Sequence, residues 1–427
     1  MTSRERVRAA INHREPDRVP IDIGGTKVTG IHVDEYIKIG RYLGIDVEPP
    51  KCYEQFQMLA RVEEPVLRWL HGDVIQLENV YETWGYKNAD WKPWVNTAGN
   101  TILMPGTFQC KVKENGDIAL FDSGGKHAAD MAANGGYFER LPNPPLDLMK
   151  EISFMDVQKF RKTIPMYSDE ELGILEKRAK FLYENTDYSI HGGALKGKLG
   201  TTGIFAGHPF TEWLCILAGE PEYAGELLEA AGDAAVENMR RYLQAVGPYI
   251  DTILISTTDF GTQTGELFSP ETFRELYMPN YKKMCSFVHK NAQAKTMFHS
   301  CGSIRNIIPF FIEAGCDILN PIQANSYRME PGELKRAYGD QLVFWGAGVD
   351  SQTVYPLGTP QEVRSQVKTR LRELMPGGGC VFSPIHNTQY DVPVENVQAF
   401  VDTVLEFGIY GKQGGVYDYD SKSESMY

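Results

Sequence analysis

The sequence lacks a long apolar run, a paired-cysteine pattern and an excess of basic residues, and each absence excludes a class of protein. No stretch approaches the roughly 20 apolar residues that a membrane-spanning helix needs. Residues 1–16 are rich in arginine but are not followed by an apolar core, so we expect no signal peptide. The seven cysteines are scattered and odd in number. They argue against a disulfide framework and fit a reducing compartment, so we expect a cytoplasmic protein.

The charge balance is acidic. Lysine and arginine number 43 against 56 aspartates and glutamates, which gives a formal net charge of −13. A surface of this sign disfavours phosphate backbones and anionic lipids, so we expect no nucleic-acid partner and no membrane partner. Hydrophobic residues make up 42% of the 427 residues, which is enough to bury the core of one large barrel domain with an extension, or of two domains.

A segment in the first third of the chain has a different residue pattern from the rest. Between Thr83 and Phe121, turns containing glycine or proline separate short alternating runs, and Asn115-Gly116 is a strong hairpin signal. This pattern predicts an antiparallel meander. Residues 124–145 are expected to form irregular loop. We therefore expect a lid-like insertion at about 80–150.

Elsewhere, apolar runs alternate with amphipathic helices. Strands are expected at 19–23, 73–77, 188–191, 251–255, 295–299, 317–320, 342–345 and 380–383. Helices are expected at 221–246, 270–291, 331–338, 360–374 and 393–407, and another is expected to begin at Ser303. The strand runs are continuously apolar, as in strands covered on both faces. The alternation predicts an α/β fold with a parallel barrel, as a single domain over 1–416 with a flexible acidic tail at 417–427.

Three residues that follow barrel strands form a soft-ligand set suited to zinc. His299 and Cys301 lie on a loop just past one strand, and His386 follows a later strand. Cys380 is a competing third ligand, since thiolates bind zinc well. However, Cys380 opens the strand that His386 closes, and six residues at ~3.3 Å each place the two roughly 20 Å apart. His386 is therefore the better candidate.

Other polar residues also follow strands and are candidates for binding a substrate at the same edge. They are Asp259, Asn320, Gln323, Asp350, Gln352 and Asn387. Asp259 could equally cap the turn before Gly261. A lone His-x-Cys in a soluble protein usually carries no function. Its position after an apolar strand, together with His386 at an equivalent position, favours a metal.

Three segments carry a resemblance to a known family. They are Arg4…Pro16-Asp17-Arg18-Val19-Pro20; Asp259-Phe260-Gly261-Thr262-Gln263 with Ser269-Pro270-Glu271; and His299-Ser300-Cys301-Gly302 with Gly315-Cys316-Asp317. These segments resemble the uroporphyrinogen decarboxylase superfamily, and the likeness extends over nearly the whole chain. The resemblance implies a (β/α)8 TIM barrel that is often a homodimer.

Two branches of that superfamily differ at positions that can be compared. Its decarboxylases carry Arg-Gln-Ala-Gly-Arg after the first strand, whose arginines hold substrate carboxylates, whereas 22–27 here reads Asp-Ile-Gly-Gly-Thr-Lys. Its cobamide-dependent methyltransferases bind zinc through His-x-Cys and a later Cys. His299 and Cys301 match the first two positions, and His386 stands in the third. The resemblance therefore favours the methyltransferase branch, with zinc and a corrinoid as cofactors.

The third ligand suggests which methyl transfer to expect. One thiolate and two imidazoles leave Zn²⁺ formally at +1, a better Lewis acid toward an oxygen leaving group than the neutral centre with two thiolates. We therefore expect transfer of methyl from a small donor, with a methoxylated aromatic as one candidate, to a corrinoid or corrinoid protein. Aromatic residues between Tyr81 and Trp94 could wall the pocket or form ordinary lid core. Transfer from a methylcorrinoid to a thiol, a metal-free decarboxylase and a non-enzymatic corrinoid-binding barrel are the alternatives.

Overall fold

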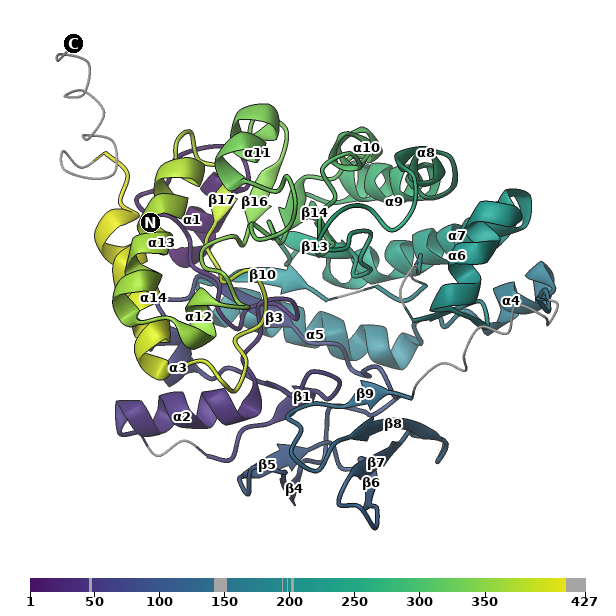
Figure 1. Cartoon of the computed structure of the whole chain (residues 1–427), viewed down its shortest axis with the longest axis horizontal. Coiled ribbons are helices and arrows are strands. Elements are labelled where there is room, and N and C mark those ends of the chain that lie inside the picture. Colours follow the sequence, from purple (N-terminus) through teal and green to yellow (C-terminus); the bar gives the residue numbers. More distant parts are fainter. Residues whose placement is uncertain (46–47, 142–151, 194, 198, 201–202, 412–427) are drawn as a thin grey trace.

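The computed structural model describes residues 1–45, 48–141, 152–193, 195–197, 199–200 and 203–411 (Figure 1). Its centre is a seven-stranded parallel sheet in the order β17-β16-β15-β14-β13-β10-β3. The strands are β3 (Val74–Leu77), β10 (Ser189–Gly192), β13 (Thr252–Ser256), β14 (Lys295–His299), β15 (Ile318–Asn320), β16 (Val343–Trp345) and β17 (Cys380–Val381). The acidic tail expected at 417–427 lies outside the described residues.

The segment expected as the first strand closes the ring. It is not a regular strand, because only Ile21 forms a bridge, parallel to Phe382. The amide of Phe382 nevertheless donates to the Pro20 carbonyl and that of Asp22 to the Phe382 carbonyl, while the Asp73 amide donates to the Ile21 carbonyl. These bonds join β17 to β3 through Pro20–Asp22, which takes the place of an eighth strand. The fold is therefore the expected (β/α)8 TIM barrel.

Helix α1 (Ser3–Ala10) plugs the amino-terminal end of this barrel. Its capping box on Thr2 and Glu5 fixes where it begins, and the apolar side of the helix packs with the barrel-interior cluster. Arg6 and Arg18 both bond the fully buried carboxylate of Asp73, at 2.7 Å each. The amino-terminal motif thus holds the plug against the starts of the strands.

The helices surround the sheet (Figure 1). They are α2 (Val33–Leu43), α3 (Glu64–Trp69), α4 (Val157–Thr163), α5 (Asp169–Asn185), α6 (Phe210–Gly219), α7 (Pro221–Val246), α9 (Met278–Asn291), α10 (Ile308–Ala314), α11 (Pro331–Tyr338), α12 (Val354–Leu357), α13 (Pro360–Leu374) and α14 (Val394–Phe407). Those expected at 221–246, 331–338 and 360–374 have these bounds, and each begins with proline, which the first turn accommodates because it needs no N–H there.

Two helix predictions need correction. The helix expected at 270–291 is interrupted: α8 (Pro270–Thr272) leads into a π-helical turn, η1 (Phe273–Tyr277), before α9 begins. The helix expected from Ser303 begins only at Ile308, since the residues between are turns and Pro309 occupies the first helical turn. No described helix is both long and apolar enough to cross a bilayer.

The insertion after β3 contains antiparallel sheets. Strands β4 (Lys92–Val95) and β5 (Thr101–Met104) pair with each other, and β6 (Gln109–Val112), β7 (Ile118–Phe121), β8 (His127–Met131) and β9 (Glu139–Arg140) form a meander. The Asn115-Gly116 turn joins β6 to β7, as expected. The prediction of irregular loop at 124–145 was wrong for β8 and β9, because pairing with β7 stabilises a strand whose own sequence has little β-propensity.

Candidate metal centre

The loop after β14 presents His299 and Cys301 together. His299 is the last residue of the strand and is buried, whereas Cys301 is half-buried. Gly302 has φ of +88°, and a Cβ there would lie 2.4 Å from the carbonyl carbon of Gly261. Only glycine allows the two loops to approach this closely, so the backbone turns immediately after Cys301.

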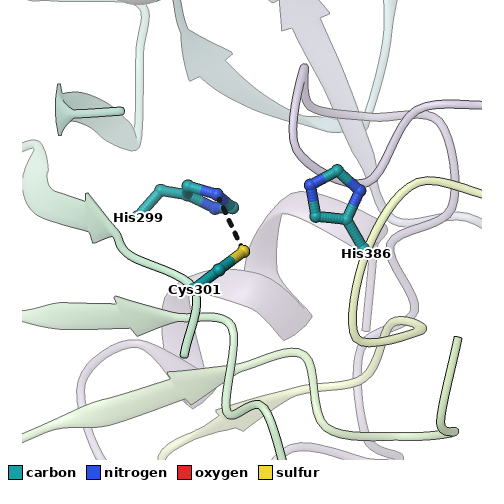
Figure 2. A group of neighbouring side chains, drawn as sticks. All are labelled: His299, Cys301 and His386. Carbon is teal, nitrogen blue, oxygen red and sulfur yellow. Dashed lines mark hydrogen bonds between the residues drawn. The ribbon is translucent and has the colours of Figure 1, made fainter. Parts of the chain in front are cut away.

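The structure brings His386 to the same place. Figure 2 shows it facing His299 and Cys301 from a separate segment. One ligand atom from each of the three side chains lies within 4.8 Å of the others, and this is the one such cluster of His, Cys, Asp and Glu side chains in the described part of the chain. The Cys301 sulfur is 3.6 Å from His299 Nε2. Tetrahedral zinc ligands at ordinary bond lengths lie about 3.5 Å apart, so the donor set and spacing fit zinc.

Asn320 fixes the orientation of the His299 ring. Its Nδ2 donates to the Trp345 carbonyl at 2.9 Å, which leaves Oδ1 to face His299 Nδ1 at 2.6 Å. Because Oδ1 can only accept, the proton of His299 sits on Nδ1 and the lone pair on Nε2 points toward Cys301. This is the tautomer that a metal ligand requires.

The protonation states of the other two side chains also matter for metal binding. Burial, with a smaller contribution from His299, lowers the pKa of His386 to about 4, so this imidazole is neutral at pH 7. Burial and the carboxylate of Asp259 raise the pKa of the Cys301 thiol well above its ordinary range. A bound cation would therefore have to displace the thiol proton. Cys380 lies apart from this cluster, with its sulfur near the Tyr410 hydroxyl.

A pocket of about 450 Å³ opens beside the cluster and includes Cys301 and His386 in its wall. Its other side chains are almost all polar: Thr262, Gln263, Gln323, Asn325, Asp350, Ser351, Gln352, Asn387 and Gln389, with Ile385 as the apolar exception. No aromatic ring is among these lining residues. The pocket can therefore offer many hydrogen bonds.

Four of the six expected substrate residues lie in this wall. They are Gln323, Asp350, Gln352 and Asn387. Each already has a structural contact: Gln323 accepts from the Gly302 amide, Asp350 from the Gln352 and Thr353 amides, Gln352 from the Asn325 side chain and Asn387 from the Gly30 amide. Their substrate role stays a prediction.

The other two expected substrate residues lie against the metal-ligand loop instead. Asp259 accepts from the Cys301 amide at 2.7 Å, and its Oδ1 is 3.9 Å from His299 Nε2. Asn320 is fully buried beneath His299. Their substrate role likewise stays a prediction, while the contacts seen here orient and anchor the candidate ligands.

Sequence reasoning did not propose several wall residues, among them Thr262, Gln263, Asn325 and Ser351. Ser351 accepts from the His386 amide at 3.1 Å and so helps to place that ligand. All four lie in loops that follow barrel strands, which was the available signal. The aromatic segment Tyr81 to Trp94 does not line this pocket, and Trp84 and Tyr86 are buried in the insertion.

Comparisons with known proteins agree with the fold. Residues 202–407 match the family model described as uroporphyrinogen decarboxylase (URO-D). A uroporphyrinogen decarboxylase of Psychromonas ingrahamii is 24% identical over 50% of this chain and 61% of that protein. A methylated-thiol–coenzyme M methyltransferase of Methanosarcina mazei is 24% identical over 40% of this chain and 49% of that protein. The alignments thus span about three-fifths of the first relative and about half of the second.

A solved structure supports the same architecture over the whole chain. A methyltransferase from Methanosarcina mazei superposes with a TM-score of 0.54, covering 95% of this chain and 99% of that one at 16% identity. At this identity the likeness establishes a shared fold.

Proposed function

We propose that this chain is a zinc-dependent methyltransferase, because residues 202–407 match the uroporphyrinogen decarboxylase family model and one of the chain's relatives is a methyltransferase. It would move a methyl group from a small oxygen-bound donor to a corrinoid, free or carried by a partner protein. The convergence of His299, Cys301 and His386 at the mouth of the barrel is the observation that supports this proposal.

The three side chains would hold zinc and leave one position for the donor oxygen, as in catalytic zinc sites. When bound, zinc would act as a Lewis acid on that oxygen, and a Co(I) corrinoid would supply the electron pair that forms the new bond to methyl carbon. The carbon–oxygen bond would break with its electrons left on the oxygen, which would then take up a proton. Asn320 would keep His299 in the tautomer that presents Nε2 to the metal.

The pocket favours a polar donor. Apart from Ile385 and the candidate ligands Cys301 and His386, its wall consists of amides, hydroxyls and one carboxylate. Moving an aryl group into such a wall would leave its amides without hydrogen bonds, at a cost of about 1–3 kcal/mol for each buried group. A small hydroxylated or amide-bearing methyl ether or alcohol therefore fits better than the methoxylated aromatic suggested by the sequence.

The loop that follows Pro20–Asp22 argues against tetrapyrrole decarboxylation. Lys27, which stands near the position of the decarboxylase arginines, is buried against two glutamates: its Nζ is 2.5 Å from Glu82 and 4.0 Å from Glu54. Both glutamates are almost fully buried. The one cation of this loop is thus neutralised inside the protein and would not bind substrate carboxylates.

Transfer from a methylcorrinoid to a thiol is the second candidate, since one of the relatives bears the name of a methylated-thiol methyltransferase. The two directions are separated by supplying Co(I) cobalamin with methyl donors in one assay and methylcobalamin with thiols in the other. A homodimer and a corrinoid-protein partner remain proposals, which light scattering and pull-down with purified corrinoid proteins would examine.

The test combines metal content with activity. We expect Cys301→Ser and His386→Ala each to lose most bound zinc and all methyl transfer to Co(I) cobalamin, followed by the cobalamin absorbance. Cys215→Ser is the matched control because Cys215 is exposed and lies outside the cluster. Full transfer by a folded, zinc-free protein would end the proposal.

A further inference from the structure

A second pocket, of about 470 Å³, lies beside β3 between α3 and α5, away from the metal-ligand cluster. It follows the length of the strand, from Val74 at its start to Glu78 just past its end. None of its lining residues belongs to the cluster or to the pocket beside it. It is therefore a separate site.

The pocket exists because the outer wall of the barrel is incompletely covered here. In β10 and β13 every residue is buried, whereas Ile75 on the outer face of β3 is half-exposed. The insertion follows β3 where a covering helix would ordinarily begin, and α3 has only six residues. Apolar side chains thus remain open to a groove.

Arg178 lies in this groove without a partner. Arg178, Phe181 and Leu182 share one side of α5 through their i, i+3 and i+4 spacing and all line the pocket. The Nη1 atom of Arg178 is buried and has no hydrogen-bond partner among the described residues, and no ion pair to Arg178 is found there. Arg178 as a whole is half-buried, and Glu78 attracts it from beyond ion-pair distance, so a ligand anion would supply the direct partner that it lacks.

The other charges of the pocket are already satisfied. Arg61 makes a bidentate pair with Glu78, at 2.7 and 2.5 Å, and lies over the Trp91 ring. Glu64 is bonded by Arg68 and by the Tyr188 hydroxyl. One positive charge remains, that of Arg178, beside apolar and aromatic walls.

We propose that this groove binds a small monocarboxylate with an apolar aryl or alkyl body, whose carboxylate pairs with Arg178. The planar guanidinium suits bidentate pairing with a carboxylate. The volume and the mixture of apolar and polar lining groups are those of small-molecule sites. An inorganic anion would leave the apolar walls unfilled, and a neutral body would leave the guanidinium unpaired.

The test uses calorimetry and thermal shift on the full chain. We expect benzoate or hexanoate to bind and to raise the melting temperature, while benzamide, hexanamide and inorganic phosphate do not at concentrations up to about 10 mM. Arg178→Met should weaken carboxylate binding by about tenfold or more, because the charge-assisted pair is lost. The Arg178→Met protein should melt close to wild type, since Arg178 makes no hydrogen bond or ion pair among the described residues that the change would remove.

Lys177→Met is the matched control, since Lys177 is the exposed neighbour of Arg178 on α5 and does not line the pocket. It should leave carboxylate binding unchanged. Absence of binding by either carboxylate, equal binding of their amides or of phosphate, or binding that survives Arg178→Met would overturn the proposal. So would a dimer, seen by light scattering, that dissociates in Arg178→Met, because the groove would then be covered by a second copy.

Discussion

Replacing Asn320 by leucine removes the one side chain that fixes the tautomer of His299. Leucine has the same branched shape as asparagine, although it is bulkier, and it can neither accept from His299 Nδ1 nor donate to the Trp345 carbonyl. In the variant the imidazole can rotate or carry its proton on Nε2. Either change removes the lone pair that faces Cys301.

The expected fall in zinc affinity can be estimated from the loss of the hydrogen-bond partner of His299. Removing the hydrogen-bond partner of a metal-ligating histidine costs about 10–100-fold in metal affinity, or roughly 1.4–2.7 kcal/mol. We therefore expect Asn320→Leu to bind zinc about 10–100-fold more weakly than wild type, measured by competition with a chromophoric chelator. The buried Trp345 carbonyl also loses its donor, so the free energy of unfolding should fall by about 1–3 kcal/mol.

Two further variants separate orientation from packing. Asn325→Leu makes the same chemical change at an exposed wall residue that touches no candidate ligand, and it should leave zinc affinity within about twofold. Asn320→Asp keeps an acceptor for His299 Nδ1 while losing the donor to Trp345, so it should retain most of the affinity. Wild-type zinc affinity in a folded Asn320→Leu protein would refute the reasoning.

Three other changes have predictable outcomes. His386→Cys should keep zinc bound but slow methyl transfer from an oxygen donor by about tenfold or more, because a second thiolate reduces the Lewis acidity of the metal; an unchanged rate would show that this charge does not matter. Asp73→Ala should lower the free energy of unfolding in urea by about 3–5 kcal/mol, since it leaves Arg6 and Arg18 without their buried carboxylate, and a loss under 1 kcal/mol would contradict that account. Burial raises the pKa of Glu35 to about 7. The folded protein therefore binds more protons than the unfolded chain between about pH 4.5 and 7, and its stability falls as pH rises through that window. Glu35→Gln should thus be more stable than wild type by roughly 3 kcal/mol at pH 8 and by nearly nothing at pH 4, and equal gains at both values would exclude the carboxylate as the cause.

Much of the architecture could be predicted from local sequence. The starts of α7, α11 and α13 are set by proline, whose fixed φ and missing N–H suit only the first turn. The strand that carries His299 is a short apolar run broken by Gly302. Interactions between residues close in the sequence decide where these helices begin and where this strand ends, so both can be predicted from the amino-acid sequence. The late start of α10 follows from Pro309, a local signal that the prediction overlooked. Strands β8 and β9 were missed because pairing with neighbouring strands outweighs their weak local preferences.

The sequence by itself determined which residue types stand after the barrel strands, and therefore that His299, Cys301 and His386 were candidates for one site. Only the tertiary structure decided which side chains orient these three residues and which side chains line the pocket beside them. Closure of the ring through Pro20–Asp22 brings together segments more than 80 residues apart, places Asn320 under His299 and surrounds the cluster with amides in place of aromatic rings. These relations depend on the register and spacing of neighbouring strands, which no local pattern specifies.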